Sequence, residues 1–293
     1  MDTPINPLVD YAFKLLLGAQ RNASILVDFL NAVLKPEPPI QNVHVLNPFN
    51  SQEFDEDKLT IVDVKATDEA GRTYQIEVQL DLRKTLQARA LFNWARIYGA
   101  QLEKGEDYSI LKPVISIWIL DGVLFRDSTW VHHRFRMVDE RSGTLFSDHL
   151  QVHLLQLGRF EAQVPLDDED QWVYFLKEAR NWTELPAELE TPALRLAMDQ
   201  LKTISQSARD LERYRAREDY LRLQLTIENE RKQTEQDAAQ AREDLERTRQ
   251  DIERTRQALS QTEQALSQTE QARLHAEQAL SQTEQARLQA EQA

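Results

Sequence analysis

The stretch LTIVDVKATDEAGRTYQIEVQL, residues Leu59–Leu80, decides how the rest of the chain is interpreted. Its two halves, Leu59–Thr67 and Arg72–Leu80, are rich in Ile, Val and Thr and alternate in polarity, which is typical of β-strands. Between them stands Asp68-Glu69-Ala70-Gly71. An Asp in the first position and a Gly in the fourth suit a type I turn, and a left-handed Gly suits a three-residue hairpin loop. The pattern therefore predicts an antiparallel hairpin.

A three-residue loop also sets which residues of the two strands lie opposite one another. It places Val64 opposite Ile76 on an apolar side that we expect to be buried, and Asp63 opposite Glu77 on the polar side. Two like charges directly opposite each other destabilise a hairpin. A pair of carboxylates at this position therefore needs a reason.

A metal site is one such reason, because two carboxylates, a backbone carbonyl and waters form an oxygen-rich shell for Mg²⁺. Gln79 stands two residues after Glu77 and points to the same side of the strand. The alternative is a solvated polar face formed by Asp63, Lys65 and Glu77, in which the lysine offsets the charge. A two-residue loop would place Asp63 and Glu77 on opposite faces and exclude the metal site.

Several sequence blocks accompany this hairpin in a fixed order. They are Asp10-Tyr11-Ala12-Phe13-Lys14, residues 22–31 (NASILVDFLN), Asp63, Glu77-Val78-Gln79, Arg89-Ala90-Leu91, Tyr98, Gly105-Glu106-Asp107-Tyr108 and Pro113–Asp121. In these blocks and their spacing the chain resembles the Rpn-type recombination-promoting nucleases, which are transposase-like members of the PD-(D/E)xK superfamily.

The resemblance implies an α/β fold, a restriction-endonuclease-like mixed sheet flanked by helices. It implies a Mg²⁺-dependent DNA endonuclease linked to DNA mobility or recombination. Asp63 and Glu77 match the residues that hold the metal, and Gln79 stands where the superfamily usually has Lys. The related family commonly carries Gln at this position. A Gln cannot act as a base, so the group that activates the attacking water is left open.

Three further residues are weaker candidates. Asp10 matches a first acidic motif, although a helix-capping role is the preferred interpretation. Arg89 matches a family block and is suited to offsetting charge on a phosphate, and the alternative is a solvated helix face with charge pairs. Lys58 precedes the hairpin and is placed to touch a phosphate, or it is an ordinary surface lysine.

Composition limits the other possibilities. The chain has 293 residues, a formal net charge of −14 and no cysteine, so disulfides and Cys-based zinc sites are excluded. The acidic balance argues against tight, nonspecific DNA binding. The N-terminus lacks the pattern of a signal peptide, and no apolar run approaches the length of a membrane span. We therefore expect a cytoplasmic protein without a membrane partner.

Other segments are assigned from their periodicity. Val114–Leu120 is a continuous apolar run, which predicts a strand buried on both faces. In the predicted strand Trp130–Val138, His132 and His133 point to opposite faces, and we interpret them as surface or partly buried histidines. We expect Asp81 to cap a helix that runs to about Lys104, and residues 167–170 to cap one that runs to Trp182.

The C-terminal part is different in kind. We assign residues 1–205 to the nuclease-like domain with a helical C-terminal part, and residues 206–293 to a long helix or coiled coil with heptad repeats. From Leu245 the sequence repeats every seven residues, and no Gly or Pro follows Pro192. The repeat places Leu245, Ile252, Leu259, Leu266 and Leu280 at one heptad position, and mostly Thr three residues later. This pattern predicts a homo-oligomer through the coiled coil, or a single helix that pairs with nothing.

The sequence thus predicts a Mg²⁺-dependent DNA endonuclease whose partner is DNA. Two alternatives remain: a catalytically idle scaffold that acts through its coiled coil, and a nuclease directed at RNA.

Overall fold

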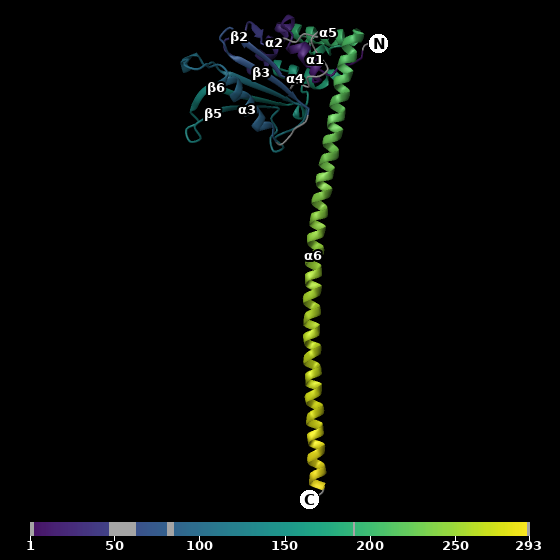
Figure 1. Cartoon of the computed structure of the whole chain (residues 1–293). Coiled ribbons are helices and arrows are strands. Elements are labelled where there is room, and N and C mark those ends of the chain that lie inside the picture. The colour runs from purple at the N-terminus through teal and green to yellow at the C-terminus, as the bar shows by residue number, and fades with distance from the viewer. Residues whose placement is uncertain (1–2, 47–62, 81–84, 190, 292–293) are drawn as a thin grey trace. The chain divides into compact units, whose positions relative to one another are not determined.

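A mixed β-sheet forms the centre of the fold in the computed structural model, which describes residues 3–46, 63–80, 85–189 and 191–291 (Figure 1). Within these residues the sheet has six strands in the order β1-β2-β3-β4-β6-β5. The β3-β4 and β4-β6 pairs are parallel, and the other neighbours are antiparallel. The strands are β1 (Val43–Val45), β2 (Asp63–Asp68), β3 (Thr73–Gln79), β4 (Val114–Leu120), β5 (His132–Val138) and β6 (Leu145–Gln156).

The predicted hairpin is confirmed as β2 and β3. The Asp68 amide donates to the Arg72 carbonyl at 3.1 Å and the Gly71 amide donates to the Asp68 carbonyl at 3.0 Å, which closes the predicted three-residue loop. Gly71 has a φ of +79°, the left-handed conformation that favours glycine. The Asp68 carboxylate also accepts from Arg72 Nε at 2.6 Å and from the Tyr74 hydroxyl at 2.8 Å. The turn is therefore fixed by its own side chains.

Six α-helices accompany the sheet in the described residues. They are α1 (Asp10–Leu17), α2 (Ala23–Leu34), α3 (Leu86–Gly99), α4 (Asp168–Glu178), α5 (Pro192–Gln206) and α6 (Ala208–Glu291). Short 3₁₀ turns are η1 (Gln20–Asn22), η2 (Tyr108–Ile110), η3 (Leu157–Arg159), η4 (Ala179–Asn181) and η5 (Ala187–Leu189).

Two of these helices test the predicted boundaries. The Asp167 side chain caps α4 by accepting from the Asp170 amide at 2.8 Å, as predicted, but the helix ends at Glu178 and not at Trp182. The helix expected to reach Lys104 is shorter, because α3 ends at Gly99. Its predicted cap, Asp81, lies outside the described residues.

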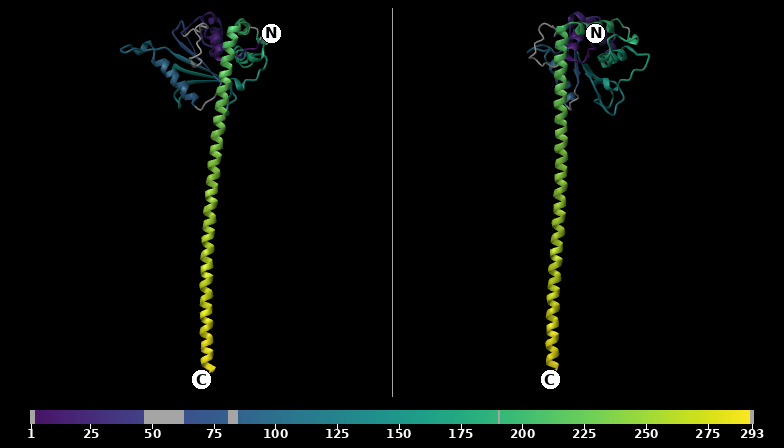
Figure 2. Two further views of the ribbon diagram at one scale, coloured as in Figure 1. Left: turned by 45° about the vertical axis from the view of Figure 1, so that its right-hand side comes forward. Right: turned by 90° about the vertical axis from the view of Figure 1, so that its right-hand side faces the viewer.

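Helices cover both faces of the sheet (Figure 1, Figure 2). Helices α1, α2, α4 and α5 share the larger hydrophobic core with Ile76, Ile117 and Leu155. Helix α3 packs through Leu86 and Ala90 on the opposite face, in a second core that includes Trp118 and Leu154. Strand β4 lies between the two cores and is buried along its whole length, as its sequence predicts.

The chain divides into two compact units, residues 1–223 and 224–293. The predicted boundary near residue 205 falls at the break between α5 and α6, whereas the first unit extends to Leu223. The start of α6 belongs to this unit because Leu211, Tyr214 and Leu221 join its core, and the Tyr214 hydroxyl accepts from the Asn6 amide at 3.0 Å.

The second unit is one helix, the remainder of α6, as the absence of Gly and Pro predicts. None of the helices in the described ranges has both the length and the apolar character of a membrane span.

Candidate active site

The polar side of the hairpin carries the candidate site. The backbone of Asp63 pairs with that of Glu77, and Lys65 pairs with Gln75, which is the predicted register. Glu77 is 0% exposed, so a solvated polar face is the wrong interpretation for this residue, and its strand neighbour Gln75 is buried as well. Asp63 is described by its backbone alone. The register places it on the same face as Glu77, since opposed residues of paired strands share a face.

Four side-chain donors surround the buried Glu77 carboxylate. Arg89 Nη2 lies 2.5 Å and Gln79 Nε2 lies 2.8 Å from Oε1. Gln75 Nε2 and Asn93 Nδ2 each lie 3.4 Å from Oε2. Burying a carboxylate is costly unless it is paired and hydrogen-bonded, and these donors offset that cost. The site therefore holds a fixed negative charge in the interior of the sheet.

Helix α3 delivers two of these donors. Arg89 and Asn93 are four residues apart and so lie on one face of the helix. Leu86 and Ala90 anchor the helix on the sheet, and Trp94 Nε1 donates to the Val114 carbonyl at 3.0 Å. The guanidinium carbon of Arg89 lies 5.6 Å from the centroid of the Trp118 ring. Arg89 keeps 36% of its side chain exposed, so it joins the buried carboxylate to the surface.

Gln79 links the carboxylate to this arginine. Its Nε2 donates to Glu77 Oε1, and its Oε1 accepts from Arg89 Nη1 at 3.1 Å. The structure therefore brings Arg89, a separate candidate in the sequence, together with the predicted pair Glu77 and Gln79.

A buried chain of polar side chains behind Glu77 was not predicted from the sequence. The Ser116 hydroxyl donates to Gln75 Oε1 at 3.2 Å, and Trp118 Nε1 donates to Ser116 Oγ at 2.9 Å. Gln75 precedes Glu77 by two residues on the same strand, and Asn93 follows Arg89 by one helical turn. These two spacings place Gln75 on the same strand face as Glu77 and Asn93 on the same helix face as Arg89, and they were the sequence signals for the two residues.

Two predicted candidates lie elsewhere. Asp10 is 2% exposed, accepts from the Tyr11 amide at 2.9 Å and forms an ion pair with Arg217 of α6. The capping interpretation is wrong, because the N-cap position of α1 is Val9 and has no side-chain cap. A role for Asp10 in an acidic motif stays a prediction. Lys58 lies outside the described residues.

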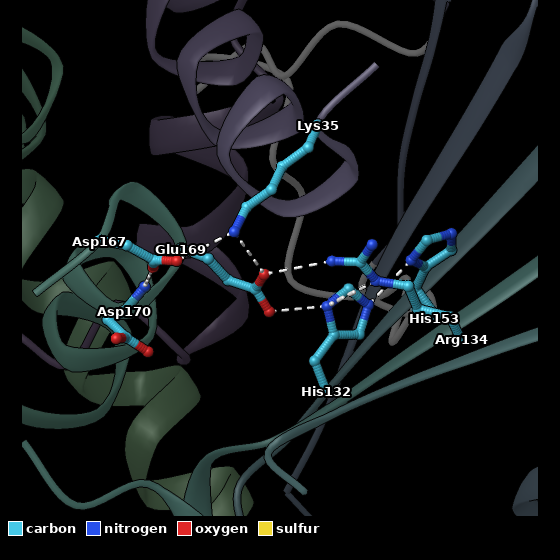
Figure 3. Close-up of polar contacts among 7 residues, drawn as sticks. All are labelled: Lys35, His132, Arg134, His153, Asp167, Glu169 and Asp170. Carbon is cyan, nitrogen blue, oxygen red and sulfur yellow. Dashed lines mark hydrogen bonds and ion pairs between the residues drawn. The ribbon is translucent and has the colours of Figure 1, made fainter. Parts of the chain in front are cut away.

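A second polar cluster lies on the other face of the sheet, between β5, β6 and the start of α4 (Figure 3). His132 Nδ1 lies 2.6 Å from Glu169 Oε1, and His132 Nε2 lies 2.8 Å from His153 Nδ1. Arg134 Nη2 lies 3.4 Å and Lys35 Nζ lies 3.7 Å from Glu169 Oε2. We call these five residues the histidine cluster.

The surroundings of His153 and the orientation of His132 can be described from these contacts. Burial, and then the neighbouring His132, Arg134 and Arg136, lower the pKa of His153 to about 3. His132 and His133 point to opposite faces as predicted, because His132 contacts Glu169 while His133 lies against Phe125. Among the described side chains, no group of three or more His, Cys, Asp or Glu residues is arranged to hold a metal.

A mixed sheet with flanking helices and a buried carboxylate on a central strand defines a restriction-endonuclease-like α/β protein. The model of the family described as "PD-(D/E)XK nuclease family transposase" matches residues 7–230, and the chain belongs to this family. The resemblance drawn from the sequence blocks is thereby confirmed, and it identifies the protein as a member of a nuclease family. Comparisons with curated proteins and with solved structures gave no significant match.

Proposed function

We propose that this protein is a Mg²⁺-dependent DNA endonuclease that acts in DNA mobility or recombination. The observation that carries the proposal is the buried Glu77 carboxylate, placed opposite Asp63 on the paired strand and beside Gln79. Membership of a PD-(D/E)XK nuclease family supports hydrolysis of phosphodiester bonds.

The two carboxylates suit a hard divalent cation. Glu77 and Asp63 supply carboxylate oxygens, the ligands that Mg²⁺ prefers. Arg89 Nη2 donates to Glu77 Oε1 at 2.5 Å. A cation can bind this oxygen only when the guanidinium moves away from it. The Arg89 side chain is 36% exposed, so the guanidinium can move from Glu77 toward solvent. When bound, a divalent ion would supply Lewis-acid polarisation of the scissile phosphate.

The protein side chains then have separate tasks. We assign Asp63 and Glu77 to holding the ion and Gln79 to orienting the attacking water, since an amide donates and accepts hydrogen bonds but takes no proton. Arg89, once released from Glu77, is placed to offset the charge that develops on the phosphate. Lys58 remains a candidate phosphate contact on sequence grounds alone.

The test is nicking of supercoiled plasmid by the full-length protein with Mg²⁺ or EDTA. Asp63→Asn and Glu77→Gln each remove one carboxylate charge with little change in shape. Glu161→Gln, at an exposed glutamate, is the matched control. Circular dichroism establishes that each variant is folded, and titration calorimetry measures Mg²⁺ binding separately from cleavage.

We expect nicking that requires Mg²⁺, survives in Glu161→Gln and falls at least a hundredfold in both site variants. Equal residual nicking by folded Glu77→Gln would overturn the assignment. Cleavage of RNA but not of plasmid, lost in the same two variants, would transfer the chemistry to an RNA substrate.

A second candidate function is that of an interaction protein working through α6. The observation in its favour is a row of exposed apolar side chains at heptad spacing: Leu245, Ile252, Leu259, Leu266 and Leu280 are 58–70% exposed. This function is compatible with an active nuclease and is tested by the oligomeric state.

A further inference from the structure

An aromatic hollow lies on the α3 face of the sheet. Its volume is about 540 Å³, and its lining includes Phe125, Arg126, Asp127, His133 and Phe135. We propose that this hollow is a base-stacking site for an unpaired nucleotide of the substrate. The proposal rests on the proposed nuclease function and adds the strand form that the protein recognises.

The register connects the hollow to the candidate active site. Glu77 pairs with Trp118, Trp118 with Leu154, and Leu154 with His133. Residues aligned in this way share one face of the sheet. Three strand spacings of roughly 4.8 Å separate Glu77 from His133, about 14 Å along the sheet. Trp118 and Leu154, which lie between the two residues, are buried beneath α3, so a nucleic-acid strand that reaches both places passes around this helix.

The aromatic rings are arranged to receive a flat ligand. Phe125 lies 4.8 Å from His133 and 5.8 Å from Phe135, measured between ring centroids. His133 and Phe135 are almost parallel, with an interplanar angle of 14° and centroids 6.1 Å apart. Phe135 is 41% exposed although it is a large apolar side chain. An open aromatic face of this kind accepts any base, because every base has a π-face.

The hollow also contains polar groups, which suit a nucleotide better than a purely apolar ligand. His133 Nε2 is buried and has no hydrogen-bond partner among the residues that the structure describes. Burial, and then the neighbouring His132, lower the pKa of the His133 ring, which favours its neutral form. Arg126 is exposed at the rim and is suited to a phosphate, whereas Asp127 beside it opposes an anion.

The backbone around the hollow is fixed in advance. The buried Gln156 side chain accepts from the Leu124 and Phe125 amides at 2.7 and 2.8 Å. Arg159 Nη2 donates to the Arg126 carbonyl. A rigid aromatic surface loses little entropy when it binds, which favours a ligand of defined shape.

The test uses the full-length protein in EDTA, where binding is measured without cleavage. The probe is a fluorescein-labelled single-stranded 12-mer followed by fluorescence anisotropy, and a second 12-mer carries 2-aminopurine to report stacking. The variants are Phe135→Ala and Phe135→Leu, of which the second keeps an apolar side chain and removes the aromatic face. Phe146→Ala is the matched control, at a phenylalanine that is 79% exposed and outside the hollow.

We expect both Phe135 variants to bind about 5- to 150-fold more weakly, the range that corresponds to the loss of one base–aromatic stack. The 2-aminopurine signal should change with the unaltered protein and with Phe146→Ala only. Equal affinities in all four proteins would overturn the inference, and so would a Phe135→Leu variant that still perturbs 2-aminopurine.

The two proposals fail separately. Stacking that depends on Phe135 in a protein that never cleaves would refute the nuclease and leave the binding site. Cleavage that depends on Asp63 and Glu77, together with unchanged binding by the Phe135 variants, would refute the stacking site alone.

Discussion

Arg89 occupies, at the residue scale, the position beside Glu77 where we propose that Mg²⁺ binds. Its guanidinium lies 2.5 Å from the fully buried carboxylate oxygen Oε1 of Glu77. The guanidinium also lies over the Trp118 ring. An arginine in this position neutralises Glu77 when no metal is bound. The same arginine must compete with any metal that binds there. Under the proposed function, stability and Mg²⁺ affinity are coupled through this one side chain.

Replacing Arg89 by Gln separates these two effects. We expect Arg89→Gln to lose about 2 kcal/mol of unfolding free energy without metal, because the buried carboxylate loses its cation. We also expect Mg²⁺ to stabilise this variant more than the unaltered protein, since no guanidinium has to be displaced. Urea unfolding with and without Mg²⁺ measures both quantities. Arg96→Gln, at an exposed arginine of the same helix, is the control. Equal stabilisation of all three proteins by Mg²⁺ would contradict competition at Glu77.

His153 predicts a dependence of stability on pH. Its pKa is lowered from 6.5 to about 3, chiefly by burial. Between these values the unfolded chain binds a proton that the folded chain does not, so stability falls as pH is lowered through this window. One proton changes the free energy of unfolding by at most about 1.4 kcal/mol per pH unit.

We expect His153→Gln to show a shallower fall in unfolding free energy than the unaltered protein between pH 6.5 and 4.5. His44→Gln, at an exposed histidine of β1, should retain the original dependence. Urea unfolding at several pH values in this range makes the comparison. Parallel curves for the His153 variant and the unaltered protein would rule out His153 as the source.

The hairpin is the element whose geometry the sequence predicts best, and Gly71 is its critical residue. At φ +79° a side chain is strained, and an added Cβ would lie 3.3 Å from Lys112 Cγ. We expect Gly71→Ala to cost about 1–2 kcal/mol and Gly71→Asn less, because Asn tolerates the left-handed region. Gly99→Ala is the control, with open space and no positive φ. Urea unfolding that gives equal costs at Gly71 and Gly99 would refute this account.

Local chemistry explains why the hairpin was predictable and its surroundings were not. Turn residues act over four positions, so Asp68 and Gly71 were enough to predict the register of β2 and β3. The partners of Glu77 depend on how α3 docks against the sheet, and periodicity does not report docking. The same limit hid the contact of His132 with Glu169, which is 37 residues away, and the pairing of Asp10 with Arg217, 207 residues away.

At the scale of the whole molecule, the nuclease-like unit is followed in the chain by a helix that carries an exposed stripe of Leu, Ile and Thr. Thr248, Thr255, Thr262 and Thr269 each donate to the carbonyl four residues earlier. Their hydroxyls are thereby satisfied within the helix, and their methyl groups remain for packing. Ile252 and Leu259 are exposed on the same side of the helix as Thr248 and Thr255. This stripe of Leu, Ile and Thr has the seven-residue spacing of a coiled-coil seam.

Association through this stripe is tested on the full-length protein by sedimentation velocity over a range of concentrations. We expect the unaltered protein to sediment as a dimer or larger oligomer. The double variant Ile252→Asp, Leu259→Asp should be a monomer, because two charges at seam positions oppose burial. The matched control is Gln257→Asp, Gln264→Asp, which adds the same charge two residues before each of Leu259 and Leu266 and should retain the oligomer. An unaltered protein that remains monomeric at every concentration would show that α6 forms no seam with a second copy.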